Sequence, residues 1–303
     1  MYQRAHPSQV NGSSSQLPAS LTLLRRLQFA LYRNFTRPDA RIIVSSDTGR
    51  VGDGPTKPKY FAVAYAEFST GPDTQMVMYS SMEQGSPTDE ELPVHEGHVM
   101  NLVRTLVRLR KEYGGKLVYG NSLLVGSLHS DVRNILAKTG RVTTRPSGDY
   151  DKWLFRMEHL PEPKETLHLA GMRWGTASLE DCRLVASRTD IPRPPLGLYR
   201  YNFASLPPGQ PGTVTDTETG LDGSLISLHC EDGYRRRGIA KLLAAKLLRQ
   251  TGVEFSNAKY AGHEWSCADV TRDNEGSRAM CTSLNATPRW SVSWVTLDLS
   301  ESL

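Results

Sequence analysis

Two kinds of apolar pattern alternate along the chain, and together they predict a mixture of helices and strands. Some stretches repeat apolar residues at helical spacing, whereas others are short apolar runs between turn-forming residues. In the first half the pattern predicts helices at Leu21–Asn34, His98–Tyr113 and Asp131–Thr139, strands at Arg41–Ser45, Tyr60–Phe68, Gln75–Ser81, Leu117–Tyr119 and Tyr150–Glu158, an acidic loop at Ser86–His95, and an irregular stretch at Ser122–Val125.

The second half repeats this order of elements. The pattern predicts helices at Ser178–Ser187, from Arg235 to Gln250 and at Asp273–Leu284, and strands at Thr166–Met172, Leu196–Ala204, Thr213–Thr219, Leu225–Cys230, Trp265–Val270 and Trp290–Leu297. The two halves show no visible sequence identity. A tandem of two similarly built α/β domains is therefore a hypothesis that rests on element order alone.

Leu160–Lys164, with the sequence LPEPK, has the composition of a linker between the halves. We expect a disordered polar N-terminus at residues 1–16, one domain at residues 17–160 and a second at residues 165–303.

Composition excludes several classes of protein. The chain of 303 residues is 38% hydrophobic and 22% charged, which is typical of a globular protein. A net charge of +4 is too small to indicate nucleic acid, and no apolar run approaches the ~20 residues of a membrane span. The four cysteines are scattered without a CxxC pair, which favours free thiols in a reducing compartment. We expect neither a nucleic-acid nor a membrane partner, no metal, and a cytoplasmic location.

The N-terminal segment leaves a second location open. No acidic residue precedes Asp39, whereas five arginines and the serines of Ser13–Ser15 do, as in a mitochondrial transit peptide. Leu21–Phe35 fits the first helix of a domain equally well.

The most informative stretch is the junction between the strand Leu225–Cys230 and the helix that follows. Glu231-Asp232-Gly233 has the composition of a turn, and Arg235-Arg236-Arg237-Gly238-Ile239-Ala240 then opens the helix. Free backbone N–H groups and the helix dipole favour an anion at a helix start, and small residues allow a ligand to approach. The junction therefore predicts a phosphate site.

The same residues carry a resemblance to a known family. Residues 235–240 fit the [QR]-x-x-G-x-[GA] loop of the GCN5-related N-acyltransferases (GNAT), with Tyr234 before it. Asn274-x-x-Ser277-x-x-Met280 is similar to a later helix start of that family. The chain most resembles the glycine N-acyltransferase-like branch. The resemblance covers about Leu167–Leu299, and the first half matches in organisation only.

The resemblance implies a fold and a ligand. It implies two GNAT-like domains, each a twisted, mixed, mainly antiparallel sheet flanked by helices, with the first domain degenerate. In the second domain the sheet would splay between Leu225–Cys230 and Trp265–Val270 to admit acyl-CoA or acetyl-CoA. The pyrophosphate would lie on the N–H groups of residues 236–240, and the pantetheine arm on the backbone of residues 228–230. The implied cofactor-binding residues are Leu228, His229, Cys230, Arg235, Arg236, Arg237, Gly238, Ile239, Ala240, Asn274 and Ser277.

Acyl transfer also needs a base for the amine, because free amines are mostly protonated at pH 7. Relatives place a carboxylate or histidine at or beside the position of Ser224. Serine cannot act unaided, and Asp222 is the nearest carboxylate, although Asp222-Gly223 is equally a hairpin turn. Counting by strand alternation places Ser224 and Cys230 on one face and His229 on the other, as a core or supporting histidine.

The leaving thiolate needs a proton, and the family often supplies it from a tyrosine at the position of Cys281. A thiol can donate a proton, but a buried structural cysteine is an alternative interpretation. The candidate catalytic residues are therefore Asp222, Ser224, Asn274 and Cys281, with Asp269, Glu264 and His263 as weaker base candidates.

His95-x-x-His98 has the spacing of a metal-ligand pair. Two ligands fall short of a zinc site, so a solvated helix start is the better interpretation.

These observations predict an acyl-CoA-dependent N-acyltransferase that acts on a small amine or amino acid by direct attack. The alternatives are a protein N-acetyltransferase of the same fold and a non-catalytic CoA-binding module, because neither acid nor base matches the family by identity.

Overall fold

The computed structural model describes residues 2–3, 16–32, 38–48, 57–162, 173–176, 183, 187, 202–205, 213–219, 222–257 and 261–301. Its contacts divide the chain into two compact units. Unit 1 consists of Met1–Asp151 and Trp290–Leu303, and unit 2 of Lys152–Arg289. The chain crosses from unit 1 to unit 2 within one strand and returns within another, as described below.

Unit 1 is built on a mixed, mainly antiparallel sheet. Its strands are β1 (Tyr2–Gln3), β2 (Ala40–Ser46), β3 (Phe61–Glu67), β4 (Met76–Ser80), β5 (Ser122–His129), β6 (Val142–Arg156) and β12 (Thr287–Asp298), and the sheet runs β1-β2-β3-β4-β5-β12-β6. The pairs from β1 to β4 and the pair of β5 with β12 are antiparallel. The parallel neighbours β4 and β5 share one register pair, Met76 with Val125.

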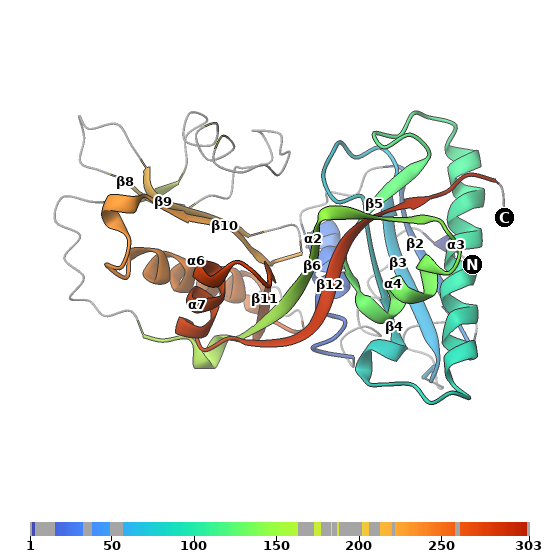
Figure 1. Ribbon diagram of the computed structural model, residues 1–303, viewed down its shortest axis with the longest axis horizontal. Coiled ribbons are helices and arrows are strands. Elements are labelled where there is room, and N and C mark those ends of the chain that lie inside the picture. The colour runs from blue at the N-terminus through green and yellow to red at the C-terminus, as the bar shows by residue number, and fades with distance from the viewer. Residues whose placement is uncertain are drawn as a thin grey trace. The chain divides into compact units, whose positions relative to one another are not determined.

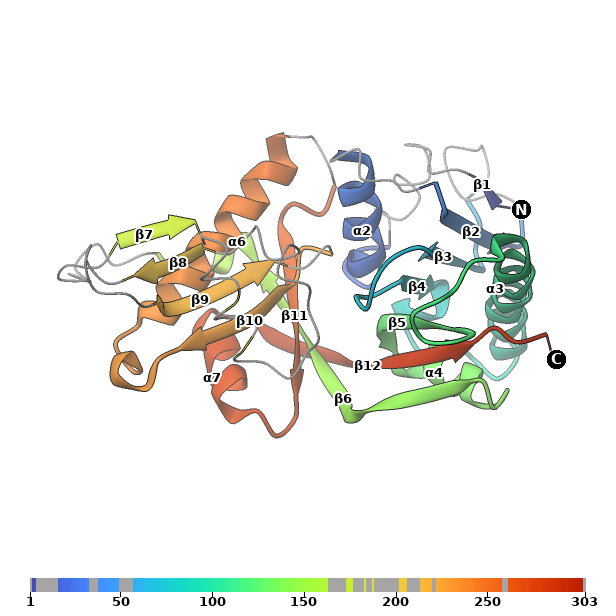
Figure 2. The ribbon, with the colours of Figure 1, turned by 90° about the horizontal axis from the view of Figure 1, so that it is seen from above.

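Helices cover both faces of this sheet. They are α2 (Leu21–Tyr32), α3 (Leu92–Tyr113) and α4 (Ser130–Ala137). Along β3, Phe61, Val63 and Tyr65 pack in the cluster of α2, whereas Ala62 and Ala64 pack in the cluster of α3. Successive side chains of a strand point to opposite faces. An uninterrupted apolar strand is therefore what a sheet covered on both sides requires, and Figure 2 shows α2 and α3 on opposite sides of β2–β4.

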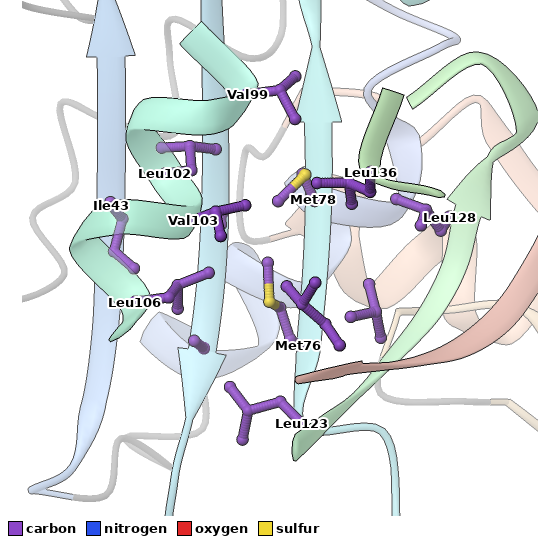
Figure 3. Packing of buried hydrophobic residues seen from close by; sticks show 14 of the residues in the cluster. Ile43, Met76, Met78, Val99, Leu102, Val103, Leu106, Leu123, Leu128 and Leu136 are labelled. Carbon is purple, nitrogen blue, oxygen red and sulfur yellow. The ribbon is translucent and has the colours of Figure 1, made fainter. Parts of the chain in front are cut away.

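The larger core of unit 1 lies between α3 and the sheet. Figure 3 shows Leu102, Val103 and Leu106 of α3 directed toward Ile43 and Met76, all of which are at most 1% exposed. These residues recur at the helical spacing that the sequence displays.

Unit 2 carries a second antiparallel sheet. The described strands are β7 (Arg173–Thr176), β8 (Asn202–Ser205), β9 (Thr213–Thr219) and β10 (Leu225–Cys230), in the order β10-β9-β8-β7. Helix α6 (Ile239–Asn257) packs on this sheet, and β11 (Trp265–Thr271) and α7 (Glu275–Ser283) follow it. Figure 1 shows α6 running beneath β8–β10. Ala244, Leu248, Ala268 and Leu284 are among the residues of the core of unit 2.

Two strands belong to both units. β6 begins in unit 1 and ends in unit 2, where β11 is its neighbour, and β12 begins in unit 2 and pairs with β5 of unit 1. The sequence suggested consecutive domains at residues 17–160 and 165–303, whereas the contacts assign the C-terminal strand to unit 1. Strand pairing over long sequence separations is invisible to a pattern of neighbours along the chain.

Most predicted elements of the described residues are present, including α2, β2–β4, α4, β9–β11, α7 and β12. Several predictions were wrong. Leu117 and Tyr119 form only isolated bridges, and the strand expected at Tyr150–Glu158 begins at Val142. α3 begins at Leu92, six residues before the expected start, because Pro93 lies at a first-turn position that needs no N–H donor. Residues 122–129 form the buried strand β5 rather than an irregular stretch.

The expected disorder of residues 1–16 is also incomplete, because Tyr2 and Gln3 pair with Ile43 and Ile42 of β2. The predicted strand Thr166–Met172 lies outside the described residues, as does the predicted helix Ser178–Ser187 apart from residues 183 and 187. Among the described helices, none combines the length and apolar character needed to cross a bilayer.

Candidate functional site

Strand β10 is interrupted by a bulge. Ile226 pairs with position 218 of β9 and His229 with position 216, so two residues of β10 intervene where β9 has one. Ser227, one of the two, has a φ of 53°. Such an extra residue unpairs the backbone locally and increases the twist of the strand.

Because of the bulge, the residues of β10 that share a face of the sheet differ from those expected from simple alternation along the sequence. Positions 216 and 218 of β9 share a face, and directly paired residues of an antiparallel ladder lie on the same side. Ile226 and His229 therefore share a face of β10, which simple alternation placed on opposite faces. His229 is half-buried, and its Nε2 lies 3.8 Å from Glu231 Oε1.

The expected splay is visible in the strand order. β10 is the edge strand of the β10-β9-β8-β7 sheet, and β11 is the edge strand of the sheet that contains β6. The two edges belong to one unit but no ladder joins them. An edge strand presents unpaired N–H and C=O groups, which an extended ligand can pair with.

The loop between β10 and α6 ends in an open helix start. Within the described residues, no hydrogen bond is donated by the backbone N–H groups of residues 236–241, and the first helical bond runs from Leu242 N to Gly238 O. Arg236 and Gly238 have φ values of 62° and 78°. Left-handed residues next to right-handed ones turn successive N–H groups toward one concave side, which is an anion-binding arrangement.

The three arginines of this loop have different roles. Arg235 Nε donates to Cys230 O at 3.0 Å, and its Nη1 lies 2.8 Å from Asp232 Oδ1. Arg235 therefore ties the loop to the end of β10. The Arg237 guanidinium stacks on the Tyr234 ring with 5.2 Å between them, and the side chains of Arg236 and Arg237 are exposed. Arg236 and Arg237 are thus the cations available to a ligand.

The turn before β10 holds two of the catalytic candidates together. Ser224 donates its Oγ–H to Asp222 Oδ1 at 2.5 Å and its N–H to the same oxygen at 3.1 Å. Ser266 of β11 donates to Gly223 O at 2.9 Å, which attaches the turn to β11. Asp222 is half-buried and Ser224 is buried. Asp222 is thus the more accessible of the two.

A buried charge that the sequence reasoning missed lies beside this turn. Lys152, near the end of β6, places Nζ 2.7 Å from Asp269 Oδ1, and the two side chains are 2% and 6% exposed. Cys267 Sγ is 3.8 Å from the same ammonium. Asp269 was a weaker base candidate, and its carboxylate is instead the counterion of Lys152. The only signal in the sequence is that Lys152 directly precedes the apolar run Trp153-Leu154-Phe155, because lysines are rarely buried unless they are paired.

Helix α7 positions the remaining candidates. Asn274 is its N-cap, and Oδ1 of Asn274 accepts the N–H of Ser277 at 2.9 Å. Cys281 is 3% exposed within the core of unit 2, and burial raises the pKa of its thiol to about 12. These facts favour the alternative interpretation of Cys281, a structural thiol, because a weaker acid in a dry core is poorly placed to protonate a leaving group.

His95 and His98 do not form the solvated helix start that the sequence suggested. His95 is 5% exposed, with Nδ1 3.5 Å from Ser81 Oγ, and His98 Nδ1 lies 2.9 Å from Ser45 Oγ. His98 therefore joins α3 to β2, and His95 joins α3 to the residue that follows β4. Among the described residues, no three His, Cys, Asp or Glu side chains gather as a metal site.

Comparison with known proteins adds to this geometry. Residues 6–153 match the family model described as the acyl-CoA N-acyltransferase verG N-terminal domain. No curated protein sequence matches the chain. A Drosophila protein of known crystal structure is similar at 12% identity, with a TM-score of 0.62 over 98% of each chain. This likeness shows a shared fold over almost the whole length.

Two further solved structures are similar at lower scores. One is a tandem GNAT protein from the clavulanic acid biosynthesis pathway, at 10% identity and a TM-score of 0.47 over 100% of this chain and 99% of that one. The other is a GCN5-related N-acetyltransferase from Kribbella flavida, at 12% identity and a TM-score of 0.47 over 78% and 86%. Both scores lie below the level from which a shared fold is inferred.

Proposed function

We propose that the chain is a GCN5-related N-acyltransferase, and that its unit 2 binds acyl-CoA and transfers the acyl group to an amine. The observation that carries this proposal is the open junction between β10 and α6. Six consecutive backbone N–H groups, at residues 236–241, are without an acceptor in the described part of the chain, and two exposed arginines accompany them.

These residues fit the pyrophosphate of CoA. A pyrophosphate needs several donors within reach of adjacent oxygens, and a helix start with a positive dipole end supplies them without a side chain. Gly238 leaves the approach to the backbone open. Arg236 and Arg237 complement the negative charge, and arginine also pairs well with a 3′-phosphate.

The strand β10, at the edge of its sheet, fits the pantetheine arm. The arm carries two amide groups in an extended chain, and it pairs with the backbone of residues 228–230 as an added strand would. Leu228 packs against the core of unit 2, and His229 and Cys230 are half-buried, so the strand backbone rather than these side chains is the element offered to the ligand. Asn274 and Ser277 mark the α7 side of the same ligand.

We further propose direct attack without a covalent enzyme intermediate. The amine nitrogen forms a bond to the thioester carbonyl carbon, the carbon–sulfur bond breaks, and the electron pair leaves with the sulfur. A backbone N–H of residues 228–230 stabilises the developing oxyanion. Asp222 accepts the proton that the nitrogen loses, and that proton ends on the thiolate of CoA. The products are an amide and CoA-SH, so atoms and charge balance.

We favour a small-molecule amine or amino acid as the acceptor and acetyl as the acyl group. A protein N-acetyltransferase is the rival reaction. A CoA-binding module without turnover is the third possibility. The burial of Cys281 is the observation in its favour, because the thiol at the family's acid position is then unsuited to protonate the leaving thiolate.

Two measurements on the full chain test the proposal together. The first is the shift of the thermal midpoint by acetyl-CoA, and the second is thiol release from acetyl-CoA with a panel of amino acids, diamines, aromatic amines and lysine peptides. Stabilisation with amine-dependent thiol release is expected. Stabilisation without release for any amine would leave only the CoA-binding module, and release with peptides alone would support the protein-modifying rival.

A further inference from the structure

Acyl transfer needs a proton donor for the leaving sulfur, and neither candidate assigned so far supplies it. Cys281 lies in a dry core, and Asp222 starts the reaction without a proton because it must accept one from the nitrogen. A thiolate is a basic leaving group, since an ordinary thiol has a pKa of about 8.5. The segment that holds the thioester is therefore the place to search for the missing acid.

His229 is the middle residue of that segment. The proposed reaction places the thioester carbonyl oxygen against a backbone N–H of residues 228–230, and the sulfur is bonded to the same carbonyl carbon. A histidine side chain that starts from this backbone lies within reach of the sulfur. An unperturbed imidazole changes charge between pH 5 and 8, so it can donate a proton near neutral pH.

The bulge in β10 decides on which face this imidazole lies. Leu225 belongs to the core that contains Ala244 and Leu248 of α6, so its face of β10 is the one that α6 covers. Leu225 pairs with position 219 of β9, whereas His229 pairs with position 216. Odd and even positions of a strand point to opposite faces. His229 therefore lies on the face away from α6, although simple alternation from Leu225 would place it on the covered one.

A carboxylate accompanies the imidazole. His229 Nε2 lies 3.8 Å from Glu231 Oε1, and the two side chains are 31% and 43% exposed. A neighbouring carboxylate favours the charged form of an imidazole. The sequence adds a second acidic residue, Asp216, at the β9 position that pairs with His229. The partial exposure of His229 and Glu231 gives the pair contact with solvent, which a group that exchanges protons in every turnover requires.

We propose that His229, oriented by Glu231, is the catalytic acid that protonates the leaving thiolate. This inference rests on the proposed function. It assigns a proton transfer to a residue for which the sequence suggested only cofactor binding or a core or supporting place.

The proton transfers balance. The nitrogen–carbon bond forms, the carbon–sulfur bond breaks, and the electron pair of that bond stays on sulfur. Asp222 takes one proton from the nitrogen, and the imidazolium of His229 gives one proton to the sulfur. Water then carries a proton from Asp222 to the imidazole, which restores both groups. The net reaction moves one proton from nitrogen to sulfur, as the proposed function requires.

Unit 2 contains a matched control in a second histidine–glutamate pair. His159 Nε2 lies 3.6 Å from Glu158 Oε1, and the two side chains are 61% and 60% exposed. Both residues belong to the short helical turn Met157–His159 that follows β6. Neither is part of β10 or of the proposed ligand site, so H159Q controls for the loss of an imidazole beside a carboxylate.

The experiment measures thiol release from acetyl-CoA by the full-length H229Q and H159Q proteins, with the amine of the panel that the unmodified protein uses best. For H229Q we expect kcat to fall about 100-fold, the low end for loss of a general acid. The Kd for acetyl-CoA should stay within about two-fold, because the strand backbone is unchanged. For H159Q we expect kcat within about two-fold of the unmodified protein. Circular dichroism and the thermal midpoint report folding of both variants.

The dependence of kcat on pH separates an acid from a structural residue. In the unmodified protein kcat should fall on the alkaline side as His229 loses its proton, and H229Q should lack that decline. E231Q should move the decline to lower pH, because the carboxylate that favours the imidazolium is gone. E231Q changes a more exposed side chain, so it tests the assignment even where H229Q does not fold.

Four results would overturn the proposal. They are unchanged kcat in H229Q, an equal loss in H159Q, an alkaline decline that E231Q leaves in place, and loss of the acidic-side decline in H229Q, which would make His229 the base. Absence of thiol release in the unmodified protein with every amine would instead contradict the proposed function. The two failures are therefore distinguishable.

Discussion

The two units contain the same strand-to-helix junction in two states. In unit 1 the junction leads from β4 to α3, and in unit 2 from β10 to α6. Each follows three antiparallel neighbours and precedes a strand and a short helix. The junction of unit 1 is closed by its own side chains, whereas the junction of unit 2 is open.

In unit 1, two glutamates accept backbone N–H groups of the segment that leads into α3, although Glu91, the N-cap of α3, makes no side-chain capping bond. Glu83 accepts the N–H of Ser80 at 2.8 Å, and Glu91 accepts the N–H of Thr88 at 3.1 Å. Hydrogen bonds, first from the backbone of Thr88 and then from Lys59 and Tyr60, lower the pKa of Glu91 to about 2. The glutamate is therefore charged across the physiological range. At the N-cap position of α3 it places negative charge near the positive end of the helix dipole, with Lys59 Nζ 3.2 Å from its Oε1.

In unit 2 the corresponding stretch is basic, and the amide donors of residues 236–241 remain available. Under the proposed function, a shared order of elements is not enough to place the ligand. The two junctions differ in the charge of the loop, which is acidic in unit 1 and basic in unit 2. The predictions that follow change one junction and use the other as the control.

The largest effect is expected from closing the open junction. Gly238→Glu adds a carboxylate at a residue with a φ of 78° and against the proposed pyrophosphate. We expect the Kd for acetyl-CoA to rise more than about 100-fold, from repulsion and backbone strain together. Isothermal titration measures the affinity.

The matched control is Gly85→Glu in unit 1. Gly85 has an extended φ of 177°, and a Cβ there meets no atom within 4 Å, so the variant should fold and bind acetyl-CoA normally. Normal binding by Gly238→Glu would show that the pyrophosphate lies elsewhere.

A smaller effect is expected from removing charge at the same junction. R236A/R237A should weaken acetyl-CoA binding about ten-fold, because charge-assisted hydrogen bonds to phosphate are lost while the backbone donors remain. Raising the salt concentration should reduce the difference between the variant and the original protein. Arg108→Ala on α3, whose side chain is 59% exposed, is the control. Equal weakening by the control would indicate a non-specific charge effect.

Two serines allow a comparison of stability between the units. Ser127 of β5 and Ser227 of β10 have φ values of 52° and 53°, and within the described structure the buried Oγ of each makes no hydrogen bond. Replacement by glycine relieves the backbone strain and removes the unsatisfied hydroxyl. We expect each variant to gain about 1 kcal/mol in the free energy of unfolding, measured by urea titration. A decrease in the free energy of unfolding at either position would mean that the serine makes a contact whose stabilisation exceeds the cost of the backbone strain.

The smallest expected effect is a dependence of thermal stability on pH, which arises from two histidines of α3 in unit 1. Burial lowers the pKa values of His95 and His98, with His98 and Lys59 contributing further at His95. A lowered pKa means that the unfolded chain binds protons more readily. The associated stability is complete above the ordinary histidine pKa of 6.5, and it is lost as pH falls through the lower pKa of the folded state. We expect the thermal midpoint to drop between pH 7.5 and 5.5.

His95→Asn should make that dependence shallower without changing the affinity for acetyl-CoA at pH 7.5. A midpoint that is constant over this range in the original protein would contradict the assignment of neutral histidines to α3.

Several features of the fold and site were accessible from the sequence because they depend on neighbours along the chain. Strand β10, the turn at residues 231–233 and the basic start of α6 follow from composition and spacing within some twenty residues. The capping role of Asn274 follows from its position before a helical pattern.

Other features needed the paired structure. Alternation placed His229 on the wrong face, because a bulge in β10 is set by its register with β9. Lys152 escaped notice because its significance depends on Asp269, which lies on a strand more than a hundred residues later. The start of α3 was missed because Ser86–His95 has the acidity and proline of a loop, although Pro93 fits a first turn.

By itself, then, the sequence determined that one helix start is basic and the other acidic, because charge and glycine content are local properties. Only the tertiary structure decided that Glu83 and Glu91 accept N–H groups of the acidic segment, that the amides of residues 236–241 have no acceptor in the described part of the chain, and that a lysine of β6 is buried against Asp269 of β11. The physical reason is that hydrogen-bond satisfaction and charge burial are properties of pairs, and the chain brings those pairs together only when distant strands meet.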